Sequence, residues 1–439
     1  MLILKEASPS QQALMTSHAQ TTIYQPWIVC FTAALFFFYE FIQMNMFNAI
    51  SPELMRDFSI NATQLGYLSA SYLYADVIFL FPAGILLDRL STRIVILSAL
   101  VICILGTFFF AIATSFWFAG ICHFMAGIGN AFCFLSCIML ATRWFPPRRM
   151  ALVTGLIVTM AMTGGVVAQT PLTLLTAVVG WRNALLMNAG LGVIIFAIIW
   201  RFVRDYPQSY QEQHRKERQQ LNNLGFWQSI TLALSNSQAW LCGIYTSLLN
   251  LPIMLLGALW GSLYLTQVHH LTKTAASITT SMIFIGTIIG GPLLGWLSDR
   301  ISLRRLPMIL GALLSLLTIA AIMYLPNPSY IRLLMLFFAL GLFTSSQVIS
   351  YPMIAEGTSK AITGTSVGIA SVLIMGGGAL FQPIFGWLMD RHWDGLIVNG
   401  IRQYTLANFQ PAMMILPVAF CIGLLAICLA KETHCQTKS

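Results

Sequence analysis

The feature that most constrains this chain is a series of apolar stretches, each long enough to cross a lipid bilayer. A helix needs roughly 20 apolar residues to span the hydrocarbon core, and stretches of that length recur from Pro26 to Ala430. Only 8% of the 439 residues are charged, whereas a soluble domain carries roughly 25%. We therefore expect an all-α polytopic membrane protein with about twelve transmembrane helices.

The expected helices follow one another with short connections, except at one place. Their approximate ranges are 26–50, 64–86, 94–114, 117–141, 150–173, 183–203, 237–265, 275–297, 306–325, 330–354, 361–386 and 405–430. The longest polar segment, 205–236, lies midway along the chain. We interpret it as a cytoplasmic linker between an N-terminal six-helix half, 1–204, and a C-terminal six-helix half, 237–439.

The positions of the basic residues predict which side of the membrane each connection faces. If the N-terminus is cytoplasmic, most of the 23 Lys and Arg residues fall in segments that are then also cytoplasmic. This is the positive-inside pattern of inner-membrane proteins. We therefore expect both termini to be cytoplasmic, and the net charge of +9 requires no nucleic-acid partner.

Two patterns of the first half recur in the second half. The first is a G-x-x-x-D-R-x-x-x-R loop between the second and third helices of each half. Its members are Gly84, Asp88, Arg89 and Arg93, and then Gly295, Asp299, Arg300 and Arg304. The second is a glycine pair followed by a glutamine, in which Gln169 recurs as Gln382. Internal duplication of this kind predicts two pseudo-symmetric bundles with the substrate site at their interface.

The doubled loop resembles the signature of the major facilitator superfamily, and the resemblance extends over nearly the whole chain. It implies the major facilitator fold and a cytoplasmic latch formed by the charged residues of both loops. A glycine lets a neighbouring helix approach, and an aspartate can accept hydrogen bonds from a helix N-terminus or pair with an arginine. Such a latch would hold the two halves together on the cytoplasmic side. The alternative is that these charges only mark the topology.

A narrower resemblance rests on the first two helices. The segments Tyr39–Asn45 and 81–84 are similar to those of the phagosomal nutrient transporters of intracellular bacteria, which are associated with amino acids and nucleosides. This resemblance implies a bacterial inner-membrane carrier for a small polar nutrient, such as an amino acid or a short peptide. The fifth helix lacks the Gly-Pro pair of the family's antiporters, which favours uptake. Siderophore or drug transport is the alternative.

Two carboxylates lie deep in the expected helices, where an ionised group is costly. Glu40 and Asp76 are each roughly 10 to 12 residues from the outer end of a helix, or about 15–18 Å deep. Ionisable residues at that depth are functional candidates. We predict that these two acids couple proton movement to transport, with His123 as a third candidate. Alternatively, Glu40 binds a cationic substrate, Asp76 only bridges helices, and His123 is a packed neutral side chain.

Further polar residues lie in the helices expected to line the pore. The candidates for substrate contact are Tyr39, Gln43, Tyr72, Asn130, Gln169, Tyr245, Asn250, Gln347, Tyr351 and Gln382. Each of them could instead only join helices. The repeat offset of 211 residues places Asp76 on Thr287, so the second half has no matching acid. We expect the N-terminal half to handle the proton and the C-terminal half to shape specificity.

Other classes of function are disfavoured by what the chain lacks. No HExxH motif occurs, and a membrane-embedded enzyme is not expected. No Lys or Arg lies deep in an expected helix, which argues against the exchange of organic phosphates. We expect no cofactor and no metal, and a monomer in the lipid bilayer. A non-transporting receptor would need neither the latches nor the two deep acids.

Overall fold

The computed structural model describes residues 9–145, 149–206, 235–358, 363–398 and 400–435. Most of the expected linker, 205–236, lies outside this part of the chain. The N-terminal elements are α1 (Pro9–Asn45), α2 (Phe47–Asp57), α3 (Ala62–Arg89), α4 (Thr92–Ile112), α5 (Phe116–Trp144), α6 (Met150–Val179) and α7 (Trp181–Phe202). The C-terminal elements are α10 (Ser237–Pro252), η3 (Ile253–Trp260), α11 (Gly261–Gln267), α12 (Lys273–Ile301), α13 (Arg305–Tyr324), α14 (Tyr330–Thr344), η4 (Ser345–Ile349), α15 (Ser350–Glu356), α16 (Thr363–Arg391), α17 (Leu406–Met413) and α18 (Ile415–Leu429).

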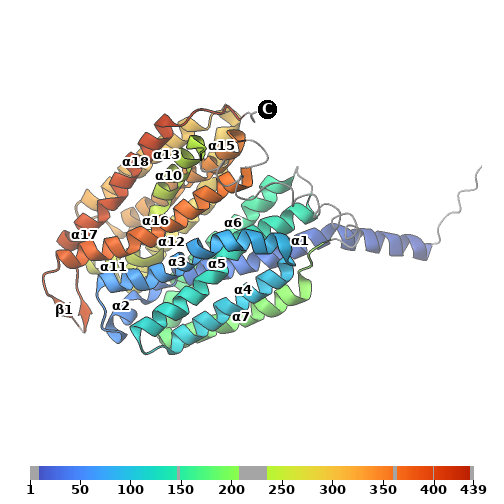
Figure 1. Ribbon diagram of the computed structural model, residues 1–439. Coiled ribbons are helices and arrows are strands. Elements are labelled where there is room, and N and C mark those ends of the chain that lie inside the picture. The colour runs from blue at the N-terminus through green and yellow to red at the C-terminus, as the bar shows by residue number, and fades with distance from the viewer. Residues whose placement is uncertain (1–8, 146–148, 207–234, 359–362, 399, 436–439) are drawn as a thin grey trace, which may run out of the picture.

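The helices agree with the expected fold class. In the described residues, 11 helical segments are long and apolar enough to cross a membrane. The helix α3, with 28 residues, runs beside them (Figure 1). The only strands of the described residues are β1 (Ile397–Val398) and β2 (Ile401–Arg402), which form a short antiparallel hairpin between α16 and α17. The all-α membrane architecture is confirmed, with this hairpin as a small addition.

The first helix of each half is irregular in its second half, which the sequence did not predict. The chain leaves regular helix at Met46, between α1 and α2, and the seventh expected helix contains the π-helix η3. The repeat offset of 211 residues places Met46 on Gly257, inside η3. Pro252 precedes η3 and has no backbone N–H to donate, which favours a change of hydrogen-bond pattern there. π-Helical turns occur frequently at functional sites.

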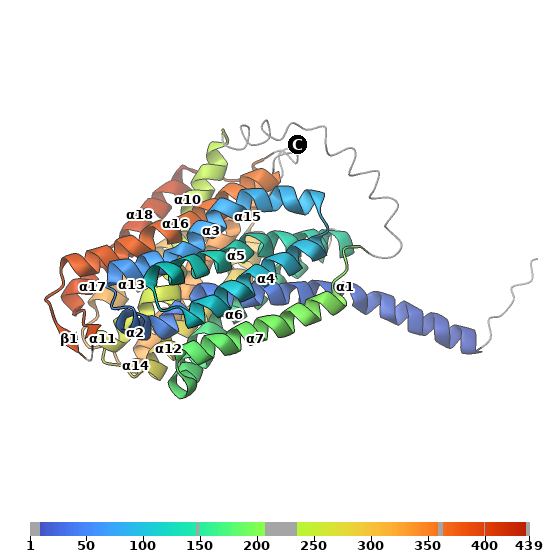
Figure 2. The same ribbon diagram turned by 60° about the horizontal axis from the view of Figure 1, so that its bottom comes forward.

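The helices form two bundles that meet along two pairs of neighbours. The helix α3 packs against α16, and α6 packs against α12. Figures 1 and 2 show the blue-to-green half beside the yellow-to-red half, with the extension of α1 and the C-terminus toward one end of the molecule and the β1–β2 hairpin at the other. We call these ends the terminal face and the hairpin face.

A glycine allows the closest approach between the two bundles. A Cβ atom on Gly66 of α3 would lie 2.7 Å from the carbonyl oxygen of Gln382 and 2.7 Å from the Cα atom of Pro383 on α16. Helices of membrane proteins commonly approach through small residues, because these let the two backbones touch. The contact fixes α3 against α16 on the side of the hairpin face.

Candidate transport site and the contacts that close it

The deepest acid, Glu40, is completely buried in α1, with 0% exposure. The hydroxyl of Tyr72 on α3 lies 2.7 Å from Glu40 Oε2 and 3.1 Å from the backbone oxygen of Glu40, so it can donate to either. The second carboxylate oxygen, Oε1, has no hydrogen-bond partner among the described residues. Glu40 therefore has the neutral Tyr72 hydroxyl as a partner and no counter-ion in this part of the structure.

A glycine on α5 makes the space that the Glu40 carboxylate occupies. A Cβ atom on Gly129 would overlap the carboxylate of Glu40 and would lie 3.2 Å from the Cβ atom of Cys103 on α4. The carboxylate thus sits between α1, α3, α4 and α5, inside the N-terminal half. Sequence reasoning missed Gly129 and Cys103, although the Gly127-Ile-Gly129 run is a signal for close helix packing.

The imidazole of His123 lies next to this cluster but does not bond to the acid. Its ring packs against Phe47, Tyr72 and Phe110, with ring centroids 4.6, 5.2 and 5.5 Å apart. Its Nδ1 atom has no hydrogen-bond partner among the described residues. The structure therefore brings His123 and Glu40 to the same tyrosine, with the histidine against the Tyr72 ring and the acid at the Tyr72 hydroxyl.

The second deep acid, Asp76, is bound by the next residue of the same helix α5. The side chain of Asn130 donates a hydrogen bond of 2.9 Å from Nδ2 to Asp76 Oδ2. Asp76 is buried, and the Oδ1 atom of Asn130 has no partner among the described residues. Because Gly129 and Asn130 are adjacent, α5 contacts both acids, and the two carboxylates share one wall.

Two further candidates on α1, Tyr39 and Gln43, lie in different surroundings. The hydroxyl of Tyr39 lies beside α7, since a Cβ atom on Gly192 would be 2.7 Å from it. Both amide atoms of Gln43 are buried without a partner among the described residues. An unpaired buried amide is costly in an apolar medium, so Gln43 is a group that a water molecule or a solute would satisfy.

The glutamine of the repeated pattern, Gln169, lies at the centre of a network that joins the two halves. Its Nε2 atom donates to the backbone oxygen of Gly257 in η3 at 2.8 Å, and its Oε1 atom accepts from Asn48 at 2.5 Å and from Thr280 at 2.9 Å. Asn48 also accepts from the backbone N–H of Ser262 at 2.7 Å. All polar groups of Gln169 have protein partners, so here it holds the halves together. Asn48, Thr280 and Ser262 were not among the predicted residues.

In the C-terminal half, two of the predicted residues serve packing. Tyr245 bonds to the backbone oxygen of Met308 at 2.7 Å and to Ser346 at 2.8 Å, and so ties three helices together. Gln382 donates to the backbone oxygen of Met254 at 2.9 Å. These bonds fix the irregular seventh helix in place.

The remaining C-terminal candidates form a small polar group. Asn250 Nδ2 donates to Gln347 Oε1 at 2.9 Å, and Tyr351 follows Gln347 by one helical turn. Asn250 and Tyr351 are half-buried, and Asn250 Oδ1 has no partner among the described residues. This group offers amide and hydroxyl hydrogen bonds and no charge.

The hairpin face is closed by direct polar contacts between the halves. Lys273 Nζ lies 2.5 Å from Glu53 Oε1. Asp390 at the end of α16 accepts hydrogen bonds from the backbone N–H and the hydroxyl of Thr63, at 2.7 and 2.6 Å, and thereby caps the N-terminus of α3. A carboxylate at a helix N-terminus is a favourable arrangement. The hydrogen bonds and ion pairs between described residues of different halves all lie toward this face.

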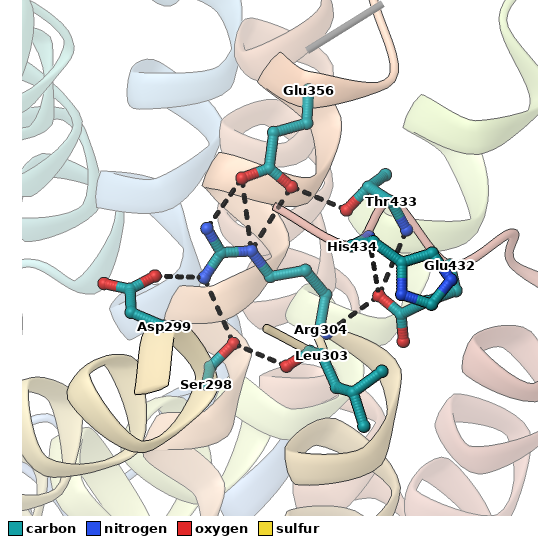
Figure 3. A network of polar contacts seen from close by, with 8 residues as sticks. All are labelled: Ser298, Asp299, Leu303, Arg304, Glu356, Glu432, Thr433 and His434. Atoms are coloured by element: carbon teal, nitrogen blue, oxygen red, sulfur yellow. Dashed lines mark hydrogen bonds and ion pairs between the residues drawn. The ribbon is translucent and has the colours of Figure 1, made fainter. Parts of the chain in front are cut away.

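At the terminal face, two arginines of the repeated loops bind partners within their own half and, among the described residues, do not join the two halves. In the C-terminal half, Arg304 binds Asp299 and Glu356, each at 2.6 Å (Figure 3). In the N-terminal half, the guanidinium of Arg93 donates to the backbone oxygen of Trp200. Each arginine thus joins helices of its own half. The side chain of Asp88 lies outside the described residues.

The other members of the loops face open space. Added Cβ atoms on Gly84 and Gly295 would meet nothing within 4 Å, so the helix approach that these glycines would permit is not made in this structure. Arg89 and Arg300 are exposed. The predicted latch between the halves is not engaged among the described residues.

The tail beyond α18 completes the charged network of the C-terminal half. Glu432 accepts hydrogen bonds from the backbone N–H groups of Arg304 and Arg305 at 2.8 and 2.9 Å, and Thr433 donates to Glu356 at 2.6 Å (Figure 3). Burial raises the pKa of Glu432, but the backbone N–H donors outweigh it and hold the pKa below its usual value. Burial lowers the pKa of the Arg304 guanidinium, and the two carboxylates raise it above its ordinary value.

Comparison with known proteins supports the fold and gives several functional leads. The sequence model of the Major Facilitator Superfamily matches residues 32–345 and 246–434. The chain is 24% identical to the membrane sensor protein UhpC of Escherichia coli (strain K12), over 88% of this chain and 89% of that protein. It is 24% identical to the phosphoglycerate transporter protein of Salmonella typhimurium, over 82% and 83%, and 23% identical to a D-galactonate transporter of Escherichia coli O6:H1, over 86% and 88%.

Solved structures show the same architecture. A bacterial homologue of the lysosomal transporter Spinster superimposes with a TM-score of 0.75 at 17% identity, over 92% of this chain and 98% of that chain. A D-xylose–proton symporter gives a TM-score of 0.74 at 14% identity, over 94% and 100%. At these identities the likeness concerns the fold alone.

Proposed function

The chain belongs to the major facilitator superfamily, and on that premise we propose that this transporter couples the movement of a small polar nutrient to protons through Glu40. The observation that carries the proposal is the burial of the Glu40 carboxylate against one neutral hydroxyl, that of Tyr72. The Lys and Arg residues of the described spans lie within three residues of a span end. No Lys or Arg of these described spans is therefore placed to neutralise Glu40 at its depth.

Protonation resolves the energetic cost of this arrangement. An ionised carboxylate in an apolar interior costs several kcal/mol unless it is paired, and a protonated carboxyl carries no charge. Glu40 would bind a proton when its site opens to one side and release it when the site opens to the other. Asp76, whose partner among the described residues is the neutral Asn130, is the second candidate for the same role.

The direction of access follows from the topology. The positive-inside pattern favours a cytoplasmic terminal face, so the contacts of Glu53, Lys273, Thr63 and Asp390 would close the external side. The described structure would then be the inward-facing state of a monomeric inner-membrane carrier. In the outward-facing state, the glycines of the two repeated loops would meet the opposite half and the latch would form.

The polar group of the C-terminal half supports a substrate without a phosphate. Asn250, Gln347 and Tyr351 offer amides and a hydroxyl, and the described parts of the helices hold no cationic clamp of the kind that phosphates require. An amino acid or a short peptide fits this chemistry and the resemblance to the phagosomal nutrient transporters. Two of the relatives named above are transporters of phosphoglycerate and D-galactonate, and they point instead to a phosphorylated or acidic solute. A sugar acid, whose single carboxylate would be balanced by the cotransported proton, is therefore the second candidate, ahead of a siderophore or a drug.

The test is uptake by the purified protein in proteoliposomes with an inside-alkaline pH gradient. The solutes would be amino acids, dipeptides, nucleosides, D-galactonate and hexose phosphates. We expect concentrative uptake of an amino acid or a peptide. Accumulation of galactonate alone would favour the second candidate, and accumulation of a hexose phosphate would contradict the argument from missing cations.

The variant Glu40→Gln tests the coupling itself. The amide keeps the shape of the protonated carboxyl and cannot release a proton. We expect it to abolish concentrative uptake and to retain counterflow, because exchange of substrate does not require proton release. The exposed Asp394 provides the control, and Asp394→Asn should transport normally. Normal pH-driven accumulation by Glu40→Gln would exclude Glu40 as the coupling residue. Binding without transport in the wild-type protein would favour a receptor role, and one relative is named a membrane sensor protein.

A further inference from the structure

A groove between α3 and α16 lies outside the transport site. Its volume is about 270 Å³, and its walls include Tyr67 and Tyr74 of α3 with Leu380 and Trp387 of α16. These four side chains are exposed. They repeat every seven residues on each helix, so each pair lies on one helix face. The groove is therefore an aromatic and aliphatic slot along the seam of the two halves.

The position of the groove decides what it faces. At its end toward the hairpin face, Thr63 lines the groove and is bound to Asp390, so the halves are in contact there. Gly66 meets the backbone of Gln382 one turn further on. The exposed apolar side chains of the groove lie on the outer side of this contact between α3 and α16. They therefore face the hydrocarbon of the bilayer.

A cation that forms no ion pair with a described carboxylate lies at the same end of the groove. Arg391 follows Trp387 by one helical turn, and its guanidinium carbon is 5.4 Å from the centroid of a Trp387 ring. Arg391 is exposed, and it forms no ion pair within the described ranges. By contrast, Arg402 of the hairpin pairs with Asp390 at 3.4 Å. Arg391 is the last residue of a spanning helix, and the ends of spanning helices lie at the depth of the lipid headgroups.

We propose that this groove binds one anionic glycerophospholipid, with an acyl chain between α3 and α16 and its phosphate on Arg391. A guanidinium forms strong charge-assisted hydrogen bonds with phosphate oxygens. Phosphatidylglycerol suits the site better than phosphatidylethanolamine, because the ammonium group of the latter competes with Arg391 for its own phosphate. Since one wall comes from each half, the bound lipid stabilises the closed hairpin face.

The experiment uses the full chain reconstituted in phosphatidylcholine vesicles. A small fraction of phosphatidylglycerol or phosphatidylethanolamine carries a photoactivatable diazirine in its acyl chain, and labelled peptides are mapped by mass spectrometry. We expect the phosphatidylglycerol probe to label 63–74 and 380–387 in preference to other lipid-facing segments, such as the exposed face of α7. The phosphatidylethanolamine probe should label this groove less.

Two variants and one control separate the headgroup contact from the acyl-chain contact. Arg391→Gln should reduce labelling of the groove about fivefold, as expected for one basic residue near a charged membrane surface. Ile384→Trp, which fills the groove and keeps Arg391, should also reduce it. Arg332 is exposed near the start of α14, and Arg332→Gln should leave the labelling unchanged. Equal labelling by both probes, or wild-type labelling of either Arg391→Gln or Ile384→Trp, would overturn the proposal.

Discussion

At the residue scale, the environment of Glu40 depends on groups that are small or neutral. The Tyr72 hydroxyl has one proton and two acceptors within reach, the carboxylate and the backbone oxygen of Glu40. When the carboxyl is protonated, it can itself donate to Tyr72, and the hydroxyl proton is then free for the backbone oxygen. The proton on Glu40 would therefore change the contact between α1 and α3. Gly129 is the residue that leaves space for this exchange.

The variant Gly129→Ala tests the space beside the carboxylate. The added methyl group would overlap the Glu40 carboxylate, and overpacking of this kind costs roughly 1–3 kcal/mol. We expect proton-driven uptake to fall at least tenfold in proteoliposomes, with normal insertion in the membrane. Gly120 on the same helix is the matched control, because a Cβ atom there would meet only Leu68 Cδ1 at 3.8 Å.

A second variant identifies the cause of the loss. Glu40→Asp shortens the side chain by one methylene group, so the double variant Glu40→Asp with Gly129→Ala should transport better than Gly129→Ala alone. Equal uptake by Gly129→Ala and Gly120→Ala would show that the tight contact has no role in coupling. A loss in the double variant as deep as in Gly129→Ala would show that the methyl group acts elsewhere.

At the element scale, the same helix cap occurs once in each half. Asp205 follows α7 by three residues and accepts from the backbone N–H of Arg93 at 2.9 Å, near the start of α4. Glu432 follows α18 by three residues and accepts from the backbone N–H of Arg304 at 2.8 Å, before α13. The last helix of each half thus supplies a carboxylate to the N-terminus of its third helix. The repeated loops therefore stabilise each half, in addition to any latch that they form between the two halves.

The variant Glu432→Gln tests the cap in the C-terminal half. It removes the negative charge at the N-terminus of α13, which should cost about 1 kcal/mol at neutral pH and lower the midpoint of thermal unfolding in detergent. Since the pKa of Glu432 is lowered in the folded protein, its contribution is present above about pH 4.5 and is lost as the pH falls through the lowered value. The difference from the wild type should shrink over that range.

The control for the cap is the preceding residue. The side chain of Lys431 is exposed, and only its backbone is bound, to Gln238, so Lys431→Gln should unfold like the wild type. A Glu432→Gln protein as stable as Lys431→Gln at neutral pH would mean that the tail does not stabilise the C-terminal half.

At the scale of the whole molecule, the parts that could be predicted from sequence depend on local composition or spacing. The spans, the doubled loop and the deep acids Glu40 and Asp76 are of this kind. The roles of Gln169 and Arg93 could not be predicted, because their partners lie about ninety or more residues away along the chain. A polar residue in a pore helix gives the same sequence signal whether it contacts a solute or the opposite half. The break at Met46 likewise has no proline or glycine beside it.

The closure of the hairpin face provides the last prediction. Transport by alternating access requires that Glu53 and Lys273, which lie 2.5 Å apart at their tips, separate in each cycle. Both side chains are partly exposed, with 25% and 30% exposure, so cysteines at the two positions are accessible to reagents. We expect a short bifunctional methanethiosulfonate reagent to join Glu53→Cys and Lys273→Cys and to stop uptake. A reducing agent should restore it.

The background and the controls make this result specific to the contact between the halves. The side chains of Cys421, Cys428 and Cys435 are at least partly exposed and would be replaced by serine, whereas the buried cysteines would be kept. Each single cysteine variant should keep most of its uptake after treatment, because loss of one partly exposed ion pair costs only about 0–1 kcal/mol. Full uptake by the cross-linked double variant would mean that the hairpin face stays closed throughout transport. In that case the solute would not pass between the two halves, and the alternating-access mechanism proposed for this chain would be wrong.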